Sequence, residues 1–278
     1  MITVNLKGGL GNQFFQYATG RYLSLKNNRK LSLNIEFYEN TPSNNTLRNY
    51  QLSLFNIDKK VDIRRISSII FKIIQKLKSR LISEGLQFSI ADIQSKMFLP
   101  VYLNGYFQKE KYFKDIRELL LNEFVLTKEL GDEAKKIKEV IEKNEAVCIG
   151  IRRGDYLLPN NLKIYGVCSL DYYQEAIKYI RTRVVKPLIF VFSDDTEWGK
   201  KEFISKDIIF IDNTTIKDYE QMYLMSLCKH NVIANSTFYW WGAWLNKNPN
   251  KIVIAPKQWL VNKTSDELEI LPKDWIQI

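Results

Sequence analysis

Five short apolar segments in the second half of the chain constrain its fold more than any other feature. Turn residues bound each one, and stretches with helical periodicity separate them; they span residues 146–156, 187–195, 207–212, 231–236 and 251–256. Strands that alternate with helices at this spacing form a parallel sheet covered by helices on both faces. The sequence therefore predicts an α/β domain in this half.

The first half begins with an α/β unit of its own. Residues 2–8 (ITVNLKG) alternate as a short strand, run into a glycine turn, and precede a helical pattern in residues 14–28. A strand, a glycine turn and a helix in this order typically open an α/β domain. We predict an N-terminal α/β domain over residues 1–135 and a second one over residues 136–278.

Composition and the chain start exclude several classes of protein. Of 278 residues, 41 are Lys or Arg and 31 are Asp or Glu, so the net charge of +10 suggests an anionic partner. None of the three cysteines lies in a CxxC pair, and the N-terminus does not read as a signal peptide. No stretch approaches the roughly 18 apolar residues that span a bilayer. We expect a cytoplasmic protein.

The chain has one histidine, His230, which lies between a helical pattern and an apolar strand. A Ser-His-Asp triad or a polyhistidine metal site would have to use it. A basic residue near a helix C-terminus interacts favourably with the helix dipole, so we expect His230 to cap the helix before it.

Residues 66–82 have apolar side chains at helical spacing and lysines beside them. Such an amphipathic helix packs on the protein's own core or rests on an anionic membrane surface. A peripheral membrane contact through residues 66–82 is therefore one of two interpretations.

Polar clusters follow three of the predicted strands in the second half. In an open parallel sheet ligands bind where the strands end, so these clusters should lie together. Arginine gives fixed charge and paired donors, while hydroxyl and amide groups at a helix start complete a diphosphate site. The clusters are Arg152-Arg153-Gly154-Asp155-Tyr156, Ser193-Asp194-Asp195 and Asn235-Ser236-Thr237.

Each cluster also has a purely structural interpretation. Adjacent arginines are often surface charges, and Asp194-Asp195 could cap the helix that follows them. Asn235-Ser236 could equally be a helix cap, with the two following tryptophans in the core. Their common position after predicted strands favours a ligand site.

Six motifs in order make the chain resemble glycosyltransferase family 11, the galactoside α-1,2-fucosyltransferases that use GDP-fucose. They cover residues 3 to about 260 and are GGLGNQFFQYATGRYLS, LNGYFQKEKYF, IRRGDY, GVCSLDYY, VFSDD and ANSTFYWWGAWLN. The resemblance implies a GT-B-like α/β architecture, with two Rossmann-type domains facing a cleft. It also implies that the C-terminal domain binds the GDP-sugar and the N-terminal domain contributes the acceptor side.

The resemblance implies inverting transfer of L-fucose to the 2-hydroxyl of a terminal galactose, with no metal and no cofactor beyond the donor substrate. Arg152 would bind the β-phosphate with Arg153 in support, Asp194 and Asp195 the guanine or ribose, and Asn235, Ser236 and Thr237 the phosphates. The remaining predicted contacts are Gly11 and Ser193 to the donor and Gln13, Tyr156 and Tyr165 to the acceptor. The acceptor would be a galactose-terminated oligosaccharide or lipid-linked glycan of the O-antigen or capsule type, met on the inner face of the membrane.

One departure concerns the base. Similar sequences commonly carry histidine two residues before the first arginine, where this chain has Gly150. Asp155 is then the nearest carboxylate, either as the base or as a brace for an arginine, and Asn12 could orient the hydroxyl. We predict Arg152, Asp155 and Asn12 as the catalytic group. Asp194-Asp195 lacks the DxD spacing that often holds a metal, so we expect no metal site.

Other functions remain open. A fucosyltransferase of another linkage, or a transferase using another GDP-sugar, has the same motifs. A non-catalytic glycan-binding module would leave the arginine and Asn-Ser-Thr clusters unexplained. A nucleic-acid-binding protein would cluster basic and aromatic residues in a known motif, which this sequence lacks, so we expect no nucleic-acid partner.

Overall fold

The structure, a computed structural model, divides into two compact units, residues 1–128 and 129–278. It describes residues 1–40, 48–67, 70, 73, 81–83 and 100–278. The predicted boundary after residue 135 falls inside helix α6 (Asp132–Glu142). The whole of α6 belongs to the second unit because it packs against helix α10 (Asp218–Leu227), and Glu220 of α10 accepts a 2.7 Å hydrogen bond from the Gly131 N–H.

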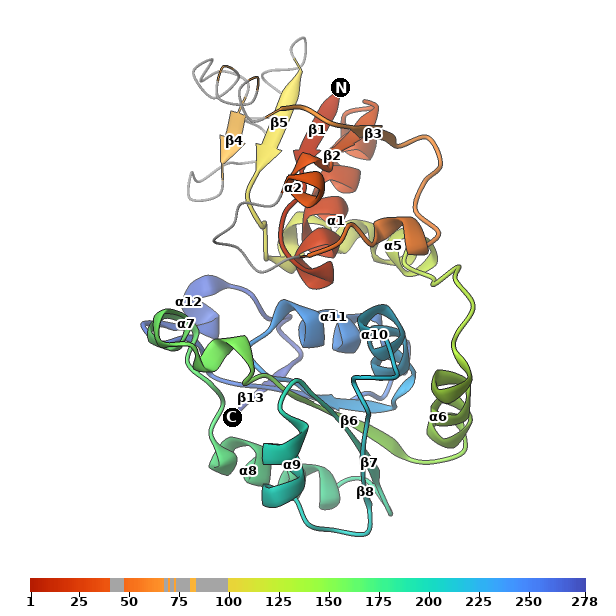
Figure 1. The fold of residues 1–278 in the computed structure, drawn as a ribbon, viewed down its shortest axis with the longest axis vertical. Helices are drawn as coiled ribbons and strands as arrows, with labels where there is room; N and C mark the ends of the chain where they lie inside the picture. The colour runs from red at the N-terminus through yellow and green to blue at the C-terminus, as the bar shows by residue number, and fades with distance from the viewer. Residues whose placement is uncertain (41–47, 68–69, 71–72, 74–80, 84–99) are drawn as a thin grey trace. The chain divides into compact units, whose positions relative to one another are not determined.

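The first unit is built on a parallel sheet with strand order β3-β2-β1-β5-β4 (Figure 1). Its strands are β1 (Ile2–Asn5), β2 (Leu31–Asn34), β3 (Asp62–Arg64), β4 (Leu81–Ser83) and β5 (Val101–Asn104). Its described helices of four or more residues are α1 (Leu10–Lys26), α2 (Glu36–Glu39) and α5 (Arg117–Glu123). The strand order reverses at β1, so the turn after β1 lies where parallel sheets typically bind ligands.

Helix α1 packs on β1 and β2 and supplies much of this core. Gly20 allows the close approach, since a Cβ there would lie 2.4 Å from a methyl carbon of Val4. On its other side, the Phe14 ring stacks on Phe124 with centroids 4.0 Å apart. The predicted strand, glycine turn and helix are confirmed at β1 and α1.

Two local predictions in this unit differ from the structure at their ends. The alternating residues 31–38 predict a second strand, but the strand stops at Asn34 and residues 36–39 turn into α2. Most of the amphipathic helix predicted over residues 66–82 lies outside the described residues; Ile70 and Ile73 are helical, whereas the last two residues, Leu81 and Ile82, belong to strand β4. In the described ranges of the chain, no helix is both long and apolar enough to cross a bilayer.

The second unit carries a six-stranded parallel sheet in the order β13-β10-β9-β6-β7-β8. Its strands are β6 (Ala146–Ile151), β7 (Leu188–Ser193), β8 (Ile208–Phe210), β9 (His230–Val232), β10 (Val253–Ala255) and β13 (Ile276–Gln277). All five predicted strands are confirmed. The edge strand β13 and a small hairpin, β11 (Gln258–Leu260) with β12 (Lys263–Thr264), were not predicted.

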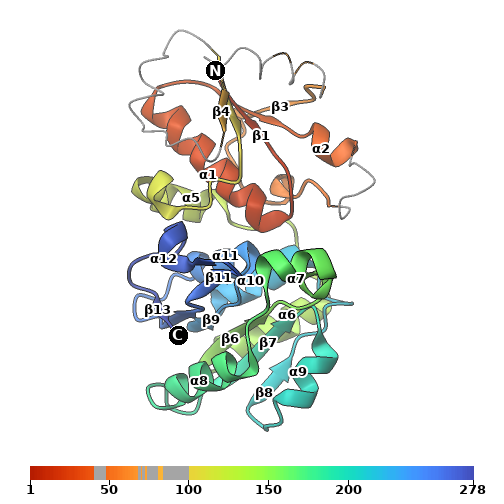
Figure 2. The same cartoon turned by 90° about the vertical axis from the view of Figure 1, so that its left-hand side faces the viewer.

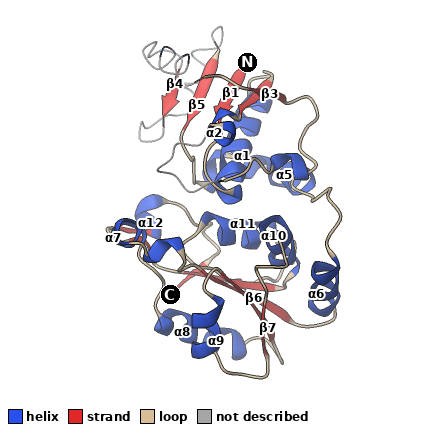
Figure 3. Cartoon of the chain, in the orientation of Figure 1, coloured by secondary structure: helices blue, strands red, loops and turns tan. Residues whose placement is uncertain are grey.

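Helices cover both faces of this sheet (Figures 2 and 3). Helix α8 (Leu170–Arg181) and helix α9 (Thr196–Glu202) lie on one face, with α10 and α11 (Thr237–Leu245) on the other. Trp240, Trp241 and Trp244 of α11 are at most 1% exposed, which confirms the structural interpretation of the tryptophan pair. Two parallel α/β units confirm the predicted GT-B-like fold class.

His230 has a structural role, but not the expected one. Helix α10 already ends at Leu227, and His230 opens strand β9, where its Nδ1 accepts a 3.0 Å hydrogen bond from the Ile252 N–H. Only an unprotonated Nδ1 can accept this bond. The predicted helix cap is therefore wrong.

Titration of His230 tests this contact. Burial, together with Lys229, lowers the pKa of the buried imidazole from 6.5 and outweighs the opposing effect of Glu145. The unfolded chain then binds the proton at higher pH, so this contribution to stability is present above pH 6.5 and is lost as pH falls through the folded-state pKa. We expect the single imidazole resonance to titrate below 6.5 in an NMR pH series. A midpoint at or above 6.5 would contradict the assignment.

Candidate active site

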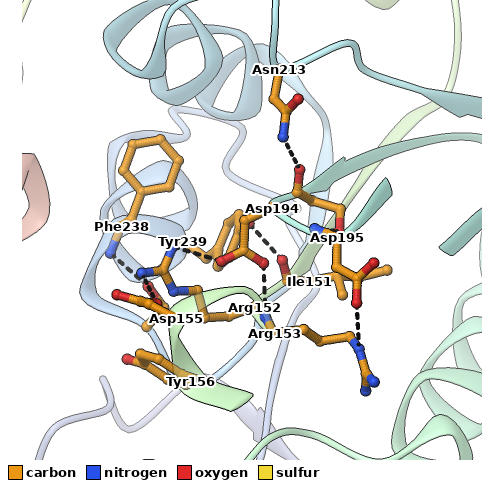
Figure 4. A network of polar contacts seen from close by, with 12 residues as sticks. Ile151, Arg152, Arg153, Asp155, Tyr156, Asp194, Asp195, Asn213, Phe238 and Tyr239 are labelled. Carbon is orange, nitrogen blue, oxygen red and sulfur yellow. Dashed lines mark hydrogen bonds and ion pairs between the residues drawn. The ribbon is translucent and has the colours of Figure 1, made fainter. Parts of the chain in front are cut away.

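Three loops meet where the central strands of the second sheet end. Strands β6 and β7 pair with Ile151 opposite Ser193, so Arg152 and Asp194 leave the sheet side by side. Strand β9 pairs with the other edge of β6 and is followed by Asn235 and Ser236. Figure 4 shows the first two clusters side by side, with Phe238 and Tyr239 of α11 next to them. The third cluster joins them through the Tyr156 hydroxyl, which donates to the Asn235 carbonyl.

Two carboxylates hold the guanidinium of Arg152. Its Nη1 lies 2.8 Å from Oδ2 of Asp194, and its Nη2 lies 2.5 Å from Oδ1 of Asp155. Burial alone lowers the pKa of Arg152, but the charges of Asp194 and Asp155 outweigh burial and the net shift is upward. The side chain is 22% exposed, so this charge is both fixed and accessible from solvent.

Arg153 points to a different set of partners. Its Nε lies 3.1 Å from Oδ2 of Asp195, and its guanidinium carbon lies 4.1 Å from the centre of the Trp198 ring. Its backbone N–H donates to Oδ1 of Asp194 at 2.8 Å. The two adjacent arginines are therefore not free surface charges, because each is held by its own acidic partner.

The acidic pair after β7 supports the arginines. Asp194 uses one oxygen for the Arg152 side chain and the other for the Arg153 backbone. Asp195 caps α9 by accepting from the Trp198 N–H, and its own N–H donates to the buried hydroxyl of Ser193. The structure thus shows the helix-capping interpretation at Asp195, and it gives Asp194 a bracing role beside the predicted donor contact.

The residues of the cluster after β9 are largely buried. The Asn235 side chain is 3% exposed and donates to the carbonyl oxygens of Tyr165 and Trp259, at 2.8 and 3.0 Å. Ser236 caps α11, accepting a 3.4 Å bond from the Phe238 N–H. Thr237, the first residue of α11, is half-buried. Asn235 thus ties two neighbouring segments to the site, and Thr237 is the more accessible of the three.

The predicted aromatic residues form a stacked pair beside Arg152. Tyr156 and Tyr165 lie at the two ends of a segment that includes helix α7 (Pro159–Tyr165), with ring centroids 4.7 Å apart. The Arg152 guanidinium sits 5.0 Å from the centre of the Tyr156 ring. The Tyr156 hydroxyl donates to the carbonyl of Asn235 at 3.3 Å, and burial raises its pKa. The pair therefore builds one wall of the site.

The position of Gly150 is filled by an aromatic ring. A Cβ at Gly150 would lie 2.4 Å from Cδ1 of Tyr239, whose hydroxyl donates to the Ile151 carbonyl at 2.8 Å. A histidine at this position would collide with that ring. The chain therefore has no imidazole at the place where the sequence resemblance leads one to expect it, and the Tyr239 ring fills the space beside Gly150.

The glycine turn of the first unit holds the other predicted residues. Gly8 has a φ of +82°, a conformation that glycine adopts without strain, and Gly11 is buried in the first turn of α1. Gln13 is 0% exposed: its amide donates to the Asn49 carbonyl at 2.8 Å and accepts from the Gln51 N–H at 2.9 Å. Gln13 has no exposed surface for the acceptor contact predicted for it, and instead ties α1 to residues 49–51.

Asn12 lies one residue away and is half-buried. Its Oδ1 accepts a 2.9 Å hydrogen bond from Nε2 of Gln108, which lies in the LNGYFQ segment after β5. The sequence alone does not point to Gln108 or Trp198, since their roles depend on contacts over long sequence separations. Across the residues that the structure describes, no three His, Cys, Asp or Glu side chains are grouped to hold a metal ion.

Comparisons with known proteins identify relatives. The model of the family described as glycosyl transferase family 11 matches residues 1–278. The chain is 36% identical to an alpha-1,2-colitosyltransferase of Escherichia coli, over 100% of this chain and 99% of that protein. It is 32% identical to the O-antigen biosynthesis glycosyltransferase WbnK of Escherichia coli, over 98% and 99%. A galactoside 2-alpha-L-fucosyltransferase of Bos taurus is 24% identical over 88% of this chain and 64% of its own length.

Solved structures share the fold at low sequence identity. A crystal structure of the NodZ alpha-1,6-fucosyltransferase soaked with GDP-fucose has a TM-score of 0.51 and 13% identity, and covers 88% of this chain and 92% of that one. A crystal structure of POFUT1 in complex with GDP-fucose has a TM-score of 0.53 and 12% identity, with coverages of 91% and 97%. These similarities support the fold class alone.

The contact between Gly150 and Tyr239 gives a stability test. Gly150→Ala places a Cβ against the Tyr239 ring, and overpacking of this kind costs about 1–3 kcal/mol. We expect the free energy of unfolding from a urea titration to fall by that amount, and further for Gly150→His. In the matched control Gly131→Ala, the new Cβ meets its nearest atom at 3.5 Å, so a smaller loss is expected. Equal losses in the two alanine variants would contradict the packing argument.

Proposed function

Because the chain belongs to glycosyltransferase family 11, we propose that it transfers L-fucose from GDP-fucose to the 2-hydroxyl of a terminal galactose, with inversion at the sugar. The observation that carries this proposal is the guanidinium of Arg152, fixed between two carboxylates at the end of β6. The names of the galactoside α-1,2-fucosyltransferases among its relatives support the linkage. The proposed acceptor is a galactose-terminated glycan, free or linked to a lipid.

The donor would bind at the end of the second sheet. A guanidinium has five N–H groups, and the two carboxylates leave several of those on Arg152 for phosphate oxygens. Helix α11 begins beside them, without an acidic residue in its first turn, so its N-terminal N–H groups favour an anion. Arg153, Ser236 and Thr237 complete the proposed diphosphate site, while Asp194, Asp195, Ser193 and Asn235 hold these groups in place.

The chemistry follows from where charge develops. As the bond between fucose and the β-phosphate breaks, negative charge builds on the departing diphosphate, so a fixed cation stabilises the transition state more than the ground state. Arg152 supplies that cation without the need for a metal. Its 2.5 Å contact with Asp155 supports the brace interpretation of that carboxylate over the base interpretation.

One relative suggests a second candidate for the donor sugar. The alpha-1,2-colitosyltransferase of Escherichia coli is 36% identical over the whole chain. Colitose is 3-deoxy-L-fucose, so the two donors would differ by one hydroxyl group. The second candidate is therefore transfer of this deoxy sugar in the same α-1,2 linkage.

The cytoplasmic location and the membrane contact of residues 66–82 stay predictions.

Product analysis tests the proposed function. We expect the protein, given GDP-fucose and a panel of β-galactosides, to form an α-fucosyl product whose NMR spectrum places the new linkage at galactose C2. Activity should persist in EDTA, since Arg152 supplies the positive charge. Transfer only from the 3-deoxy donor would select the second candidate. A strict need for Mg²⁺ or Mn²⁺ would contradict the proposed mechanism.

Replacing Arg152 by lysine tests the cation. An ammonium group cannot hold two carboxylates and a phosphate as the planar guanidinium does. We expect Arg152→Lys to lower kcat by about 10²–10³-fold, the cost of losing one donor from a charge-stabilising site, and to weaken GDP binding in calorimetry. Arg181→Lys is the control, because Arg181 makes a paired contact with Asp207 in the same unit but on its exposed surface. If Arg152→Lys behaves like the control, Arg152 does not have this role.

A further inference from the structure

The loop after β5 places a second amide against Asn12, and we propose that Gln108 is a positioning residue that fixes the direction of the Asn12 amide. In this arrangement Asn12 presents its NH₂ group to the substrate, and serves the reaction as a hydrogen-bond donor. This inference rests on the proposed function, because it assigns how one of the predicted catalytic residues acts. It concerns contacts within the first unit alone.

Asn12 occupies a constrained place in the fold. It lies in the first turn of α1, just after the central strand β1, where the strand order of the sheet reverses. Its amide covers Gly8, since a Cβ on Gly8 would lie 2.6 Å from Nδ2 of Asn12. Only a residue without a side chain leaves room for the amide here, so the glycine turn positions Asn12 from one side.

Gln108 is held from the other side by its neighbours. The Gly105 carbonyl accepts a 3.1 Å hydrogen bond from the buried Gln16 side chain of α1. Phe107 is 1% exposed and has a φ of +54°. A left-handed conformation is unfavourable at a bulky residue, and it persists only where the surroundings enforce it. Both contacts hold the loop so that Gln108 points at Asn12.

The hydrogen bond settles which end of the Asn12 amide is available. Nε2 of Gln108 donates to Oδ1 of Asn12 at 2.9 Å, so the carbonyl end is engaged. Rotating the Asn12 amide by half a turn would set its NH₂ against the NH₂ of Gln108. The Nδ2 group therefore lies away from Gln108, beside Gly8, and it is the end of the amide that can donate to a substrate oxygen.

Three replacements of Gln108 separate the direction of the bond from simple packing. Gln108→Glu has nearly the same shape but only accepts, so it turns the Asn12 amide around. Gln108→Met removes the bond, and Gln108→Lys keeps a donor. We expect kcat to fall about 10- to 100-fold in Gln108→Glu, the usual effect of losing a partner that orients a functional group. The loss should be smaller in Gln108→Met and smallest in Gln108→Lys, with GDP binding unchanged in all three.

A pH series on Gln108→Glu gives a readout that packing would not move. A protonated carboxyl group donates again, so the ratio of the variant's kcat to that of the parent should rise as pH falls toward the usual glutamate pKa of about 4.3. Melting temperatures check that the variants are folded. The control is Asn27→Asp, an amide-to-acid change at the other end of α1, where the amide donates to the Leu23 carbonyl.

The outcomes distinguish this inference from the proposed function. The assays use whichever GDP-sugar the parent protein transfers, so a parent without transferase activity overturns the proposed function. If the parent is active but kcat falls equally in Gln108→Glu and Gln108→Lys, the proposed role of Gln108 is wrong. The same holds if the ratio of the Gln108→Glu kcat to the parent kcat does not change with pH. Should Gln108→Glu not fold, Gln108→Met and Gln108→Lys decide: equal kcat values in these two also overturn it.

Discussion

The guanidinium of Arg152 and its two carboxylates are the interaction on which the second unit's site depends. The register of β6 against β7 sets Arg152 beside Asp194. The chain then turns so that Asp155 also contacts the Arg152 guanidinium. Removing the cation would leave two carboxylates close together without a counter-charge, an arrangement that raises the free energy of the folded state. Asp194 also accepts from the Arg153 backbone, so the same contact fixes the course of the loop.

The two units use different polar chemistry at the ends of their strands. The second unit gathers arginines and aspartates, which suit an anionic diphosphate. The first unit gathers amides: Asn34 donates to Asn5, Asn5 donates to Asn104, and Gln108 donates to Asn12. Neutral amides bind hydroxyl groups without attracting a counter-charge, which fits an uncharged sugar. The division into donor and acceptor sides that the sequence resemblance implies stays a prediction.

Strand positions could be predicted from the sequence, and so could the helix caps at Asp195 and Ser236, but most other side-chain contacts could not. Apolar runs that end in turn residues located β6, β7 and β9, and hence the three polar clusters. Whether a polar side chain faces solvent or its own backbone depends on contacts across long separations, as with Asn235 and the carbonyls 70 and 24 residues away. The buried Gln13 side chain is a second example, because it bonds to the backbone of Asn49 and Gln51. Short edge strands such as β13 have too few residues to carry a pattern, and β2 ended early because Asn34 turns its side chain to the Ile66 backbone.

The packing around Gly150 affects which groups are available for the proposed reaction. With Tyr239 in that space, the chain has no imidazole beside Arg152, and its one histidine supports strand β9 in its neutral form. Asp155 is held by Arg152. The groups that the second unit fixes around Arg152 are therefore cations and hydrogen-bond donors, which in the proposed reaction would act on the departing diphosphate more than on the acceptor proton. Such groups would favour a transition state in which leaving-group departure is far advanced and proton removal comes late, because they stabilise charge on the donor.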